Sequence, residues 1–305
     1  MKFIFSTLIC TLFFIPTLLV AQENQQIYYE NGIKKEEGIN NKDGKKAGAW
    51  KQYYESGTLK TIGFYINDKL EGERKTYFEN GNIKEIGKYK NGKAIGKWMK
   101  YYETGELFIK AFLVKGKSQG TWREYYKNSQ LKLSGKMKRD LKKGKWRQFY
   151  EGGALKSIVK YKKDKRVGTW LRFHPNGQVF DQGKYVNGVK NGAWTFFYED
   201  GTIKEKGYFS DGIPVGIWKG FYKNGKTQLI RDFKDGKENS IEKAFYENGN
   251  LKQEGAIKDN KETGEWKFYF ENGNVKETGK YEDGKKTGIW TIYNEDGEEA
   301  VTEEF

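Results

Sequence analysis

The sequence predicts an all-β protein, built as an elongated single-layer repeat array of consecutive antiparallel β-hairpins with a 24-residue period. Glycine is abundant at 38 residues, aromatic residues make up 16% of the chain, and proline occurs only three times. Turn dipeptides recur at fixed positions, and so do the tryptophans. All nine tryptophans lie on a single 24-residue spacing: Trp50, Trp98, Trp122, Trp146, Trp170, Trp194, Trp218, Trp266 and Trp290.

The tryptophan spacing has eleven positions, of which two are filled by Arg74 and Glu242. No insertion interrupts it between Trp50 and Trp290. A fixed period of this size is typical of a repeat array, in which each copy contacts mainly its neighbours. We therefore expect no single globular core. The expected organisation is a capping hairpin over residues 22–49 and about eleven repeats over residues 50–305, the last one truncated.

The first 21 residues differ from the rest. Lys2 is followed by a nearly continuous apolar run from residue 3 to residue 20, and Ala21 supplies a small residue at a plausible cleavage point. This pattern predicts a secretory signal peptide over residues 1–21, and the alternative is an uncleaved membrane helix. Cys10, the only cysteine, would be removed with it, so the mature chain would have no disulfide. We expect an exported protein that is periplasmic, envelope-associated or secreted.

Each repeat reads as two strands and two turns. In one unit a strand covers residues 98–102, a turn covers 103–105, and a second strand starts at Leu107. Related copies place Asn-Gly in this first turn, which favours a two-residue loop with positive φ at both residues. Such a loop would place Tyr102 opposite Leu107. The Asn-Gly copies are Asn80-Gly81, Asn248-Gly249 and Asn272-Gly273.

A second turn follows about eleven residues after the first, and it usually ends in glycine, as in Asn91-Gly92 and Asp211-Gly212. Four copies lack the glycine. We expect their replacements to adopt the left-handed region, because Asn and Asp tolerate it best after glycine. These replacements are Asp68, Asp140, Asp164 and Asn260.

The pairing register follows from the hairpin spacing. Each tryptophan is expected opposite the glycine thirteen residues on, as Trp194 and Gly207, with its ring covering bare backbone on the adjacent strand. The glycine two residues before the tryptophan should face an aromatic residue. Alternation along the strands then predicts an aromatic face and a lysine-rich face along the whole array.

The repeat unit resembles the MORN repeat, in the bacterial variant often called antitoxin-type, over essentially all of residues 27–305. The segment that carries the resemblance is Tyr89-Lys90-Asn91-Gly92-Lys93-Ala94-Ile95-Gly96-Lys97-Trp98-Met99-Lys100-Tyr101-Tyr102. The resemblance implies an elongated sheet of hairpins that acts as a scaffold for protein partners, and some members of the family bind acidic lipids. An exported chain fits the antitoxin label poorly. Arg74, Glu242 and Ser240, which stands where a glycine is expected, mark two degenerate units.

Wall-binding repeats for choline or glucan are a second resemblance, because they also use Gly-Trp, Tyr-Tyr and Asn-Gly hairpins. Their aromatic cages suit quaternary amines. Their period is shorter than 24 residues. In this chain a lysine also recurs five residues before most tryptophan positions, as at Lys93 and Lys117. The strict spacing therefore favours the MORN interpretation, with cell-wall carbohydrate binding as an alternative function.

Positive charge is concentrated in the middle of the chain. Residues 110–166 contain nineteen basic and four acidic residues, a balance of +15 that equals the net charge of the whole chain. Such a patch attracts anions, although a merely solubilising surface is the alternative interpretation. The candidate anion-binding residues are Lys115, Lys117, Arg123, Lys136, Lys138, Arg139, Lys142, Lys143, Lys145, Arg147, Lys162, Lys163, Lys165 and Arg166.

The sequence shows no catalytic pattern. His174 is the only histidine and occupies a column otherwise filled by Tyr and Phe. No set of His and Cys is spaced for zinc, and no nucleophile with a base is visible. We therefore expect a non-enzyme without cofactor or metal.

Three functions follow in order of preference. The first is an exported scaffold for protein partners of unknown identity. The second is attachment to an anionic envelope surface, either acidic lipid or lipopolysaccharide, through residues 110–166. The third is wall-carbohydrate binding. Export argues against nucleic acid as a partner.

Overall fold

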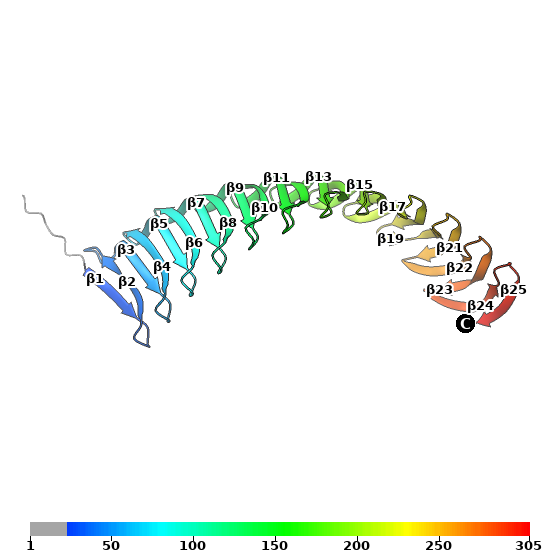
Figure 1. The fold of residues 1–305 in the computed structure, drawn as a ribbon, viewed down its shortest axis with the longest axis horizontal. Helices are drawn as coiled ribbons and strands as arrows, with labels where there is room; N and C mark the ends of the chain where they lie inside the picture. The colour runs from blue at the N-terminus through cyan, green and yellow to red at the C-terminus, as the bar shows by residue number, and fades with distance from the viewer. Residues whose placement is uncertain (1–22) are drawn as a thin grey trace, which may run out of the picture. The chain divides into compact units, whose positions relative to one another are not determined.

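The computed structural model describes residues 23–305, which form β-strands and turns without a helix (Figure 1). The predicted signal peptide, residues 1–21, lies outside the described residues. The chain divides into two compact units, which meet between residues 93 and 94. Each unit is described by itself below.

In the first unit every strand pairs antiparallel with the next one along the chain. The range expected for the cap, residues 22–49, includes β1, β2 and the start of β3, and Trp50 lies in β3. The strands are β1 (Glu23–Tyr28), β2 (Lys34–Asn40), β3 (Lys46–Tyr53), β4 (Leu59–Ile66), β5 (Lys69–Tyr77) and β6 (Ile83–Lys90).

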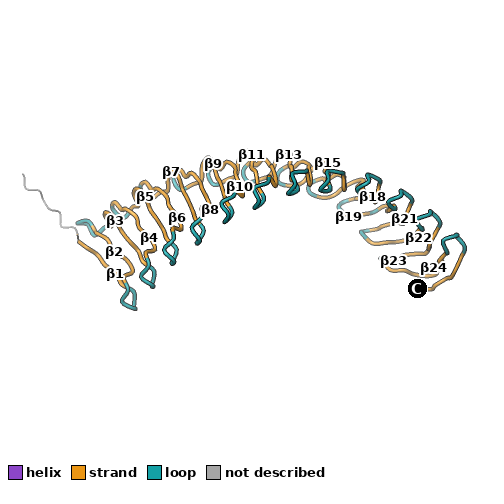
Figure 2. The backbone as a smooth tube through the Cα atoms, in the orientation of Figure 1, coloured by secondary structure: helices purple, strands orange, loops and turns teal. Residues whose placement is uncertain are grey.

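The second unit repeats the same antiparallel hairpin pattern, with loops that join consecutive strands (Figure 2). Its strands are β7 (Lys93–Tyr101), β8 (Leu107–Val114), β9 (Lys117–Tyr125), β10 (Leu131–Lys138), β11 (Leu141–Phe149), β12 (Leu155–Lys162), β13 (Lys165–Phe173), β14 (Val179–Val186), β15 (Val189–Phe197), β16 (Ile203–Ser210), β17 (Ile213–Phe221), β18 (Thr227–Lys234), β19 (Lys237–Glu238), β20 (Ser240–Phe245), β21 (Leu251–Lys258), β22 (Lys261–Tyr269), β23 (Val275–Glu282), β24 (Lys285–Tyr293) and β25 (Glu299–Glu304). The predicted fold class, consecutive antiparallel hairpins in a single layer, is confirmed.

The predicted register is also confirmed. Trp194 on β15 pairs with Gly207 on β16, thirteen residues on. Gly192, two residues before this tryptophan, pairs with Phe209. The same two pairs occur in the first unit and elsewhere in the second, so one register serves successive repeats.

The position of the indole rings differs from the prediction. The ring of Trp194 lies against Gly183 on the preceding strand β14, and a Cβ at Gly183 would approach it to 2.3 Å. The ring does not cover Gly207, because the ring of Trp218 already fills that space. Gly207 is thus paired with Trp194 on β15 and shielded by the ring of Trp218 from β17. The same contact recurs at Gly38, Gly135, Gly207, Gly255 and Gly279.

Burial of the tryptophans follows these glycines. Six rings are buried: Trp50, Trp146, Trp194, Trp218, Trp266 and Trp290. Trp122 and Trp170 are only partly buried, and the glycine eleven residues before each is replaced by Ala111 and Val159. A side chain at that position holds the ring away from the backbone. Trp98, the first tryptophan of the second unit, is half-buried.

The first turn has three residues, so the predicted two-residue loop is wrong. The Tyr102 N–H donates to the Glu106 carbonyl at 2.8 Å, and the Gly105 N–H donates to the Tyr102 carbonyl at 3.0 Å. Only the glycine adopts positive φ, at 104° in Gly105, as in a type I turn closed by a left-handed residue. Leu107 consequently pairs with Tyr101 rather than Tyr102, and a β-bulge restores the register beyond it.

The second turn agrees with the prediction. Asp211 and Gly212 both have positive φ, at 48° and 88°, which defines the two-residue hairpin loop. The four residues that replace glycine also adopt the left-handed region. Their φ values are 65° at Asp68, 68° at Asp140, 63° at Asp164 and 68° at Asn260.

Candidate functional site

The aromatic face is covered by cations, so the predicted separation of aromatic and lysine-rich faces holds only in part. The Lys190 ammonium lies 4.3 Å from the ring centroid of Trp194 and 4.7 Å from that of Phe209. Burial lowers the pKa of Lys190, and Asp181 partly opposes this effect. The same contact over a tryptophan is made by Lys46, Lys142, Arg166 and Lys286. These side chains lie along the indoles with their stems on apolar surface.

The covered indole rings argue against carbohydrate binding. Sugar or choline recognition would need open aromatic faces. The indole of Trp194 has a glycine backbone on one side and the Lys190 ammonium close to it. The six buried tryptophans therefore serve the packing between hairpins rather than an open stacking platform.

The predicted anion-binding residues occupy three parts of the sheet. Lys142 and Arg166 lie over the indoles of Trp146 and Trp170. A second group lies exposed on the strands: Arg123, Lys136, Lys143, Lys145 and Arg147. A third group lies in or next to the second turns of three consecutive hairpins: Lys115, Lys117, Lys138, Arg139, Lys162, Lys163 and Lys165.

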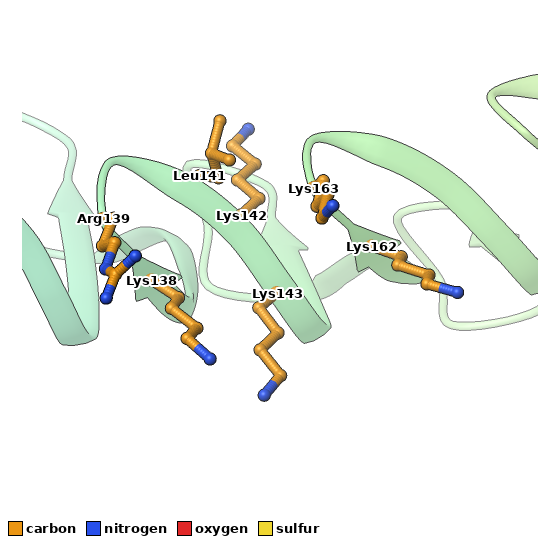
Figure 3. Close-up of a pocket in the computed structure, with 7 residues that line it drawn as sticks. All are labelled: Lys138, Arg139, Leu141, Lys142, Lys143, Lys162 and Lys163. Atoms are coloured by element: carbon orange, nitrogen blue, oxygen red, sulfur yellow. The ribbon is translucent and has the colours of Figure 1, made fainter.

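Six of these residues line one groove of about 420 Å³ (Figure 3): Lys138, Arg139, Lys142, Lys143, Lys162 and Lys163, with Leu141 as the apolar member. The groove therefore brings together cations from β10, β11 and β12 and from the turns that follow β10 and β12. In Figure 3, Lys138, Arg139 and Lys143 extend to one side of the hairpins, whereas Leu141 and Lys142 extend to the other. The cations therefore lie on both sides of these hairpin ends, and together they make the potential around the groove positive.

The acidic residues beside the groove are engaged elsewhere. Asp164 accepts a hydrogen bond from the Lys142 N–H at 2.6 Å, and Asp140 accepts one from the Ser118 N–H at 2.7 Å. Among residues 23–305, none of the six groove cations is recorded within 4.0 Å of a carboxylate oxygen. The groove cations thus form no recorded ion pair, and the nearest acids along the chain, Asp140 and Asp164, bond to backbone N–H groups.

Like charges also face each other across the strands. Lys143 on β11 pairs with Lys136 on β10 and with Lys162 on β12. Lys145 pairs with Lys160. Like charges directly opposite destabilise a sheet, so the fold alone gives no reason for this arrangement.

A second recess of about 450 Å³ lies one repeat earlier, against β7, β8 and β9. Arg123 from the predicted set contributes to it, together with Lys97, Lys110 and the exposed ring of Phe112. Lys97 and Phe112 lie outside the predicted set, because net charge per window does not show which neighbours share a recess. Their cross-strand pairing was a signal that could have indicated it.

An exposed apolar strip lies further along the second unit. Tyr208 on β16, Ile217 on β17 and Ile241 on β20 are 57%, 56% and 61% exposed. Tyr208 pairs with Ala193 and Val215, which extends the strip across neighbouring strands. The same positions hold Lys145 and Lys160 in an earlier repeat, so the sheet does not require apolar residues there.

His174 has a structural contact. Its Nε2 lies 3.1 Å from the carbonyl oxygen of Phe197. In the next repeat the equivalent residue, Tyr198, makes the same contact, because its hydroxyl donates to the Phe221 carbonyl. Within residues 23–305, no group of three or more His, Cys, Asp or Glu residues could hold a metal ion. The same residues contain no helix that is long and apolar enough to cross a membrane.

The degenerate repeat around Glu242 contains a buried acid. Glu238 stands where other repeats place a cation over the tryptophan, and it is 6% exposed. Burial raises the pKa of Glu238 to about 7; Glu242 raises it further and Arg231 opposes the shift. One of its carboxyl oxygens has no hydrogen-bond partner.

A constant hairpin framework with exposed residues that change from repeat to repeat defines a repeat scaffold. The chain belongs to the MORN repeat family, in its variant form. The family matches residues 46–67, 70–91, 118–138, 142–163, 166–187, 190–211, 214–235, 238–259 and 262–283. No curated protein sequence matches the chain.

Among solved structures, the chain is similar to two large assemblies at 10% identity. One is a TcdB2-TccC3-Cdc42 crystal structure, with a TM-score of 0.18 and coverage of 90% of this chain and 19% of that one. The other is the Photorhabdus luminescens Tc holotoxin pore, with a TM-score of 0.17 and coverage of 92% and 16%. The chain thus spans less than a fifth of their length.

Proposed function

We propose that the chain is an exported, non-enzymatic scaffold that binds protein partners through the exposed faces of its hairpins. MORN repeats are modules that bind proteins or membranes, and this coarser role comes with the family. Export rests on the apolar segment at residues 3–20. The binding of protein partners rests on the exposed apolar strip.

The observation that carries protein binding is the exposure of Tyr208, Ile217 and Ile241 on a framework that does not need them. Large exposed apolar residues of this kind mark interaction sites, and Asp232 on β18, which pairs with Ile217, lies among them. Lys206 and Lys219 pair with each other beside the strip and have no carboxylate recorded within 4.0 Å. The strip therefore suits a protein segment with apolar side chains bordered by acidic ones.

Capture from the envelope fraction tests this function. The full mature chain is compared with a variant that carries Tyr208→Lys, Ile217→Lys and Ile241→Lys. We expect a specific protein to be retained by the wild type and lost from the variant. Retention of the same proteins by both would contradict protein binding through the strip.

A second candidate function is attachment to an anionic envelope surface through residues 110–166. The groove of six cations without carboxylate partners favours it. Co-sedimentation with vesicles of acidic lipid or with lipopolysaccharide, at low and high salt, measures it. We expect charge reversal at Lys138, Arg139, Lys142 and Lys143 to abolish sedimentation at low salt. Unchanged sedimentation would exclude attachment through this patch.

A further inference from the structure

Three consecutive turns carry a cation at a position that disfavours it. Lys115, Arg139 and Lys163 occupy the first position of the second turn, with φ of 51°, 51° and 50°. The other two-residue turns of this kind place Asn or Asp there: Asn67, Asn91, Asn187, Asp211, Asp235, Asp259 and Asp283. The exception is therefore confined to neighbouring hairpins.

This exception costs stability. Asn and Asp adopt the left-handed region far more readily than Lys or Arg, because their short side chains bond to the local backbone. Strained positions that persist are concentrated at binding sites. The opposed lysines, Lys143 between Lys136 and Lys162, add a second unfavourable arrangement at the same edge. Two independent departures from good sheet design thus occur in the same neighbouring hairpins, and Arg139, Lys143 and Lys163 from them line the groove.

The spacing of the three tips indicates the shape of the ligand. Consecutive tips are separated by two strands, which corresponds to about 10 Å along the sheet. The groove between two of them is recessed, with about 420 Å³ of space among the cations. A flexible chain can enter such a recess and contact successive tips. A bilayer presents a plane of headgroups that meets the tips but does not fill the groove.

We propose that this edge, defined by Lys115, Arg139, Lys163 and the groove residues, binds one soluble linear polyanion with phosphate-type groups across several hairpins. The proposal rests on the anion-binding function proposed for residues 110–166. It differs in the ligand, which is a single soluble polyanion rather than an envelope surface. Lysine and arginine both bind phosphate oxygens, lysine as a point charge and arginine through paired N–H groups. Contacts at successive tips add through effective concentration.

Inorganic polyphosphate of graded chain length is the probe, measured by isothermal titration with the full mature protein. We expect affinity per chain to rise with length until one chain reaches three tips, and then to level off. Lys115→Asn, Arg139→Asn and Lys163→Asn together should weaken binding of long chains by about tenfold or more. The same variant should be at least as stable as the wild type, since Asn suits these turns.

A matched control removes the same charge elsewhere. Lys184→Asn, Lys258→Asn and Lys267→Asn change three exposed strand residues outside residues 110–166, and this variant should retain most of the affinity. Equal losses in both variants would show that only the general field matters and would overturn the proposal. Affinity independent of chain length would also overturn it. Sedimentation with acidic vesicles without polyphosphate binding would reject the linear ligand but leave surface attachment standing. Failure of both assays would reject the anion-binding function as well.

Discussion

Gly183 has no Cβ, and this allows the Trp194 ring of the next hairpin to pack against its backbone. The residue pairs with Trp170 on one side and is covered by the ring of Trp194 from the other. The indole therefore joins its own hairpin to the one before it. Cross-strand aromatic contacts, such as the edge-on packing of Tyr185 against Trp194 at 5.4 Å, extend the same connection.

Gly183→Ala should consequently destabilise the second unit. Its Cβ would lie 2.3 Å from the indole, so the ring or the strand must move. Overpacking of this kind costs about 1–3 kcal/mol, and urea unfolding measures it. Gly152→Ala is the control, because a Cβ there meets nothing within 4 Å and φ is not in the left-handed range. Equal stability of the two variants would contradict the ring-over-glycine contact.

Glu238 should make stability depend on pH. Its pKa rises from 4.5 to about 7 on folding, so the folded chain holds a proton that the unfolded chain releases between these values. The contribution is therefore fully present below about pH 4.5 and lost as the pH rises to about 7. Above pH 7 the folded state carries a buried, ionised carboxylate.

Glu238→Gln removes this titration and keeps the shape of the side chain. We expect the melting temperature of the variant to exceed that of the wild type at pH 8 and to match it at pH 4.5. Thermal unfolding followed by circular dichroism gives both values. A difference that stays the same at both pH values would mean that Glu238 does not titrate in this range.

At the scale of the element, the glycine two residues before each tryptophan keeps its strand continuous. Gly216 and Gly264, two residues before their tryptophans, have φ of 62° and 67° and form a bulge that keeps the ladder continuous. Ser240 stands at this position in the degenerate repeat and does not adopt positive φ. The strand is broken there into β19 and β20, and β18 pairs with each separately.

Amide exchange should therefore be fastest around this break among the inner strands of the second unit. Amides of residues 237–241 should exchange before those of 213–217, because fewer ladder hydrogen bonds hold them. Hydrogen exchange read by mass spectrometry resolves the two segments. Ser240→Gly should slow exchange at the break. Equal protection in the wild type would argue that the break does not weaken the ladder.

Several features of the elements could be predicted from the sequence. The hairpin register could be predicted from the repeated spacing. A short turn midway between a tryptophan and the glycine thirteen residues later places these two residues opposite each other. The left-handed Asp140 and Asp164 followed from their place in the turn. These features depend on local chemistry and spacing, which a sequence displays directly.

Other features could not be predicted, because they depend on the third dimension. Pairing alone did not show that the ring of Trp194 leans over Gly183 rather than Gly207. The three-residue first turn was missed, because a bulge compensates for the added residue. The cations above five of the indoles were also missed. Lys190 and Trp194 are four residues apart and share a face by ordinary alternation, but spacing does not show that the lysine side chain lies along the ring.

At the scale of the whole molecule, each compact unit combines a constant framework with variable exposed residues. Glycines and tryptophans maintain the framework, while charge dominates one stretch and apolar residues another. The repeats therefore allow surfaces to change without altering the fold. The exposed cations and apolar residues of residues 23–305 suit binding surfaces.

Exposed residues should therefore be replaceable without loss of the hairpin framework. The most direct test measures the unfolding free energy of the Tyr208→Lys, Ile217→Lys, Ile241→Lys variant beside its capture of partners. Exposed substitutions should change stability by no more than about 0.5 kcal/mol each, while partner capture is lost. A loss of stability comparable to that of Gly183→Ala would show that the strip belongs to the framework and would contradict the account.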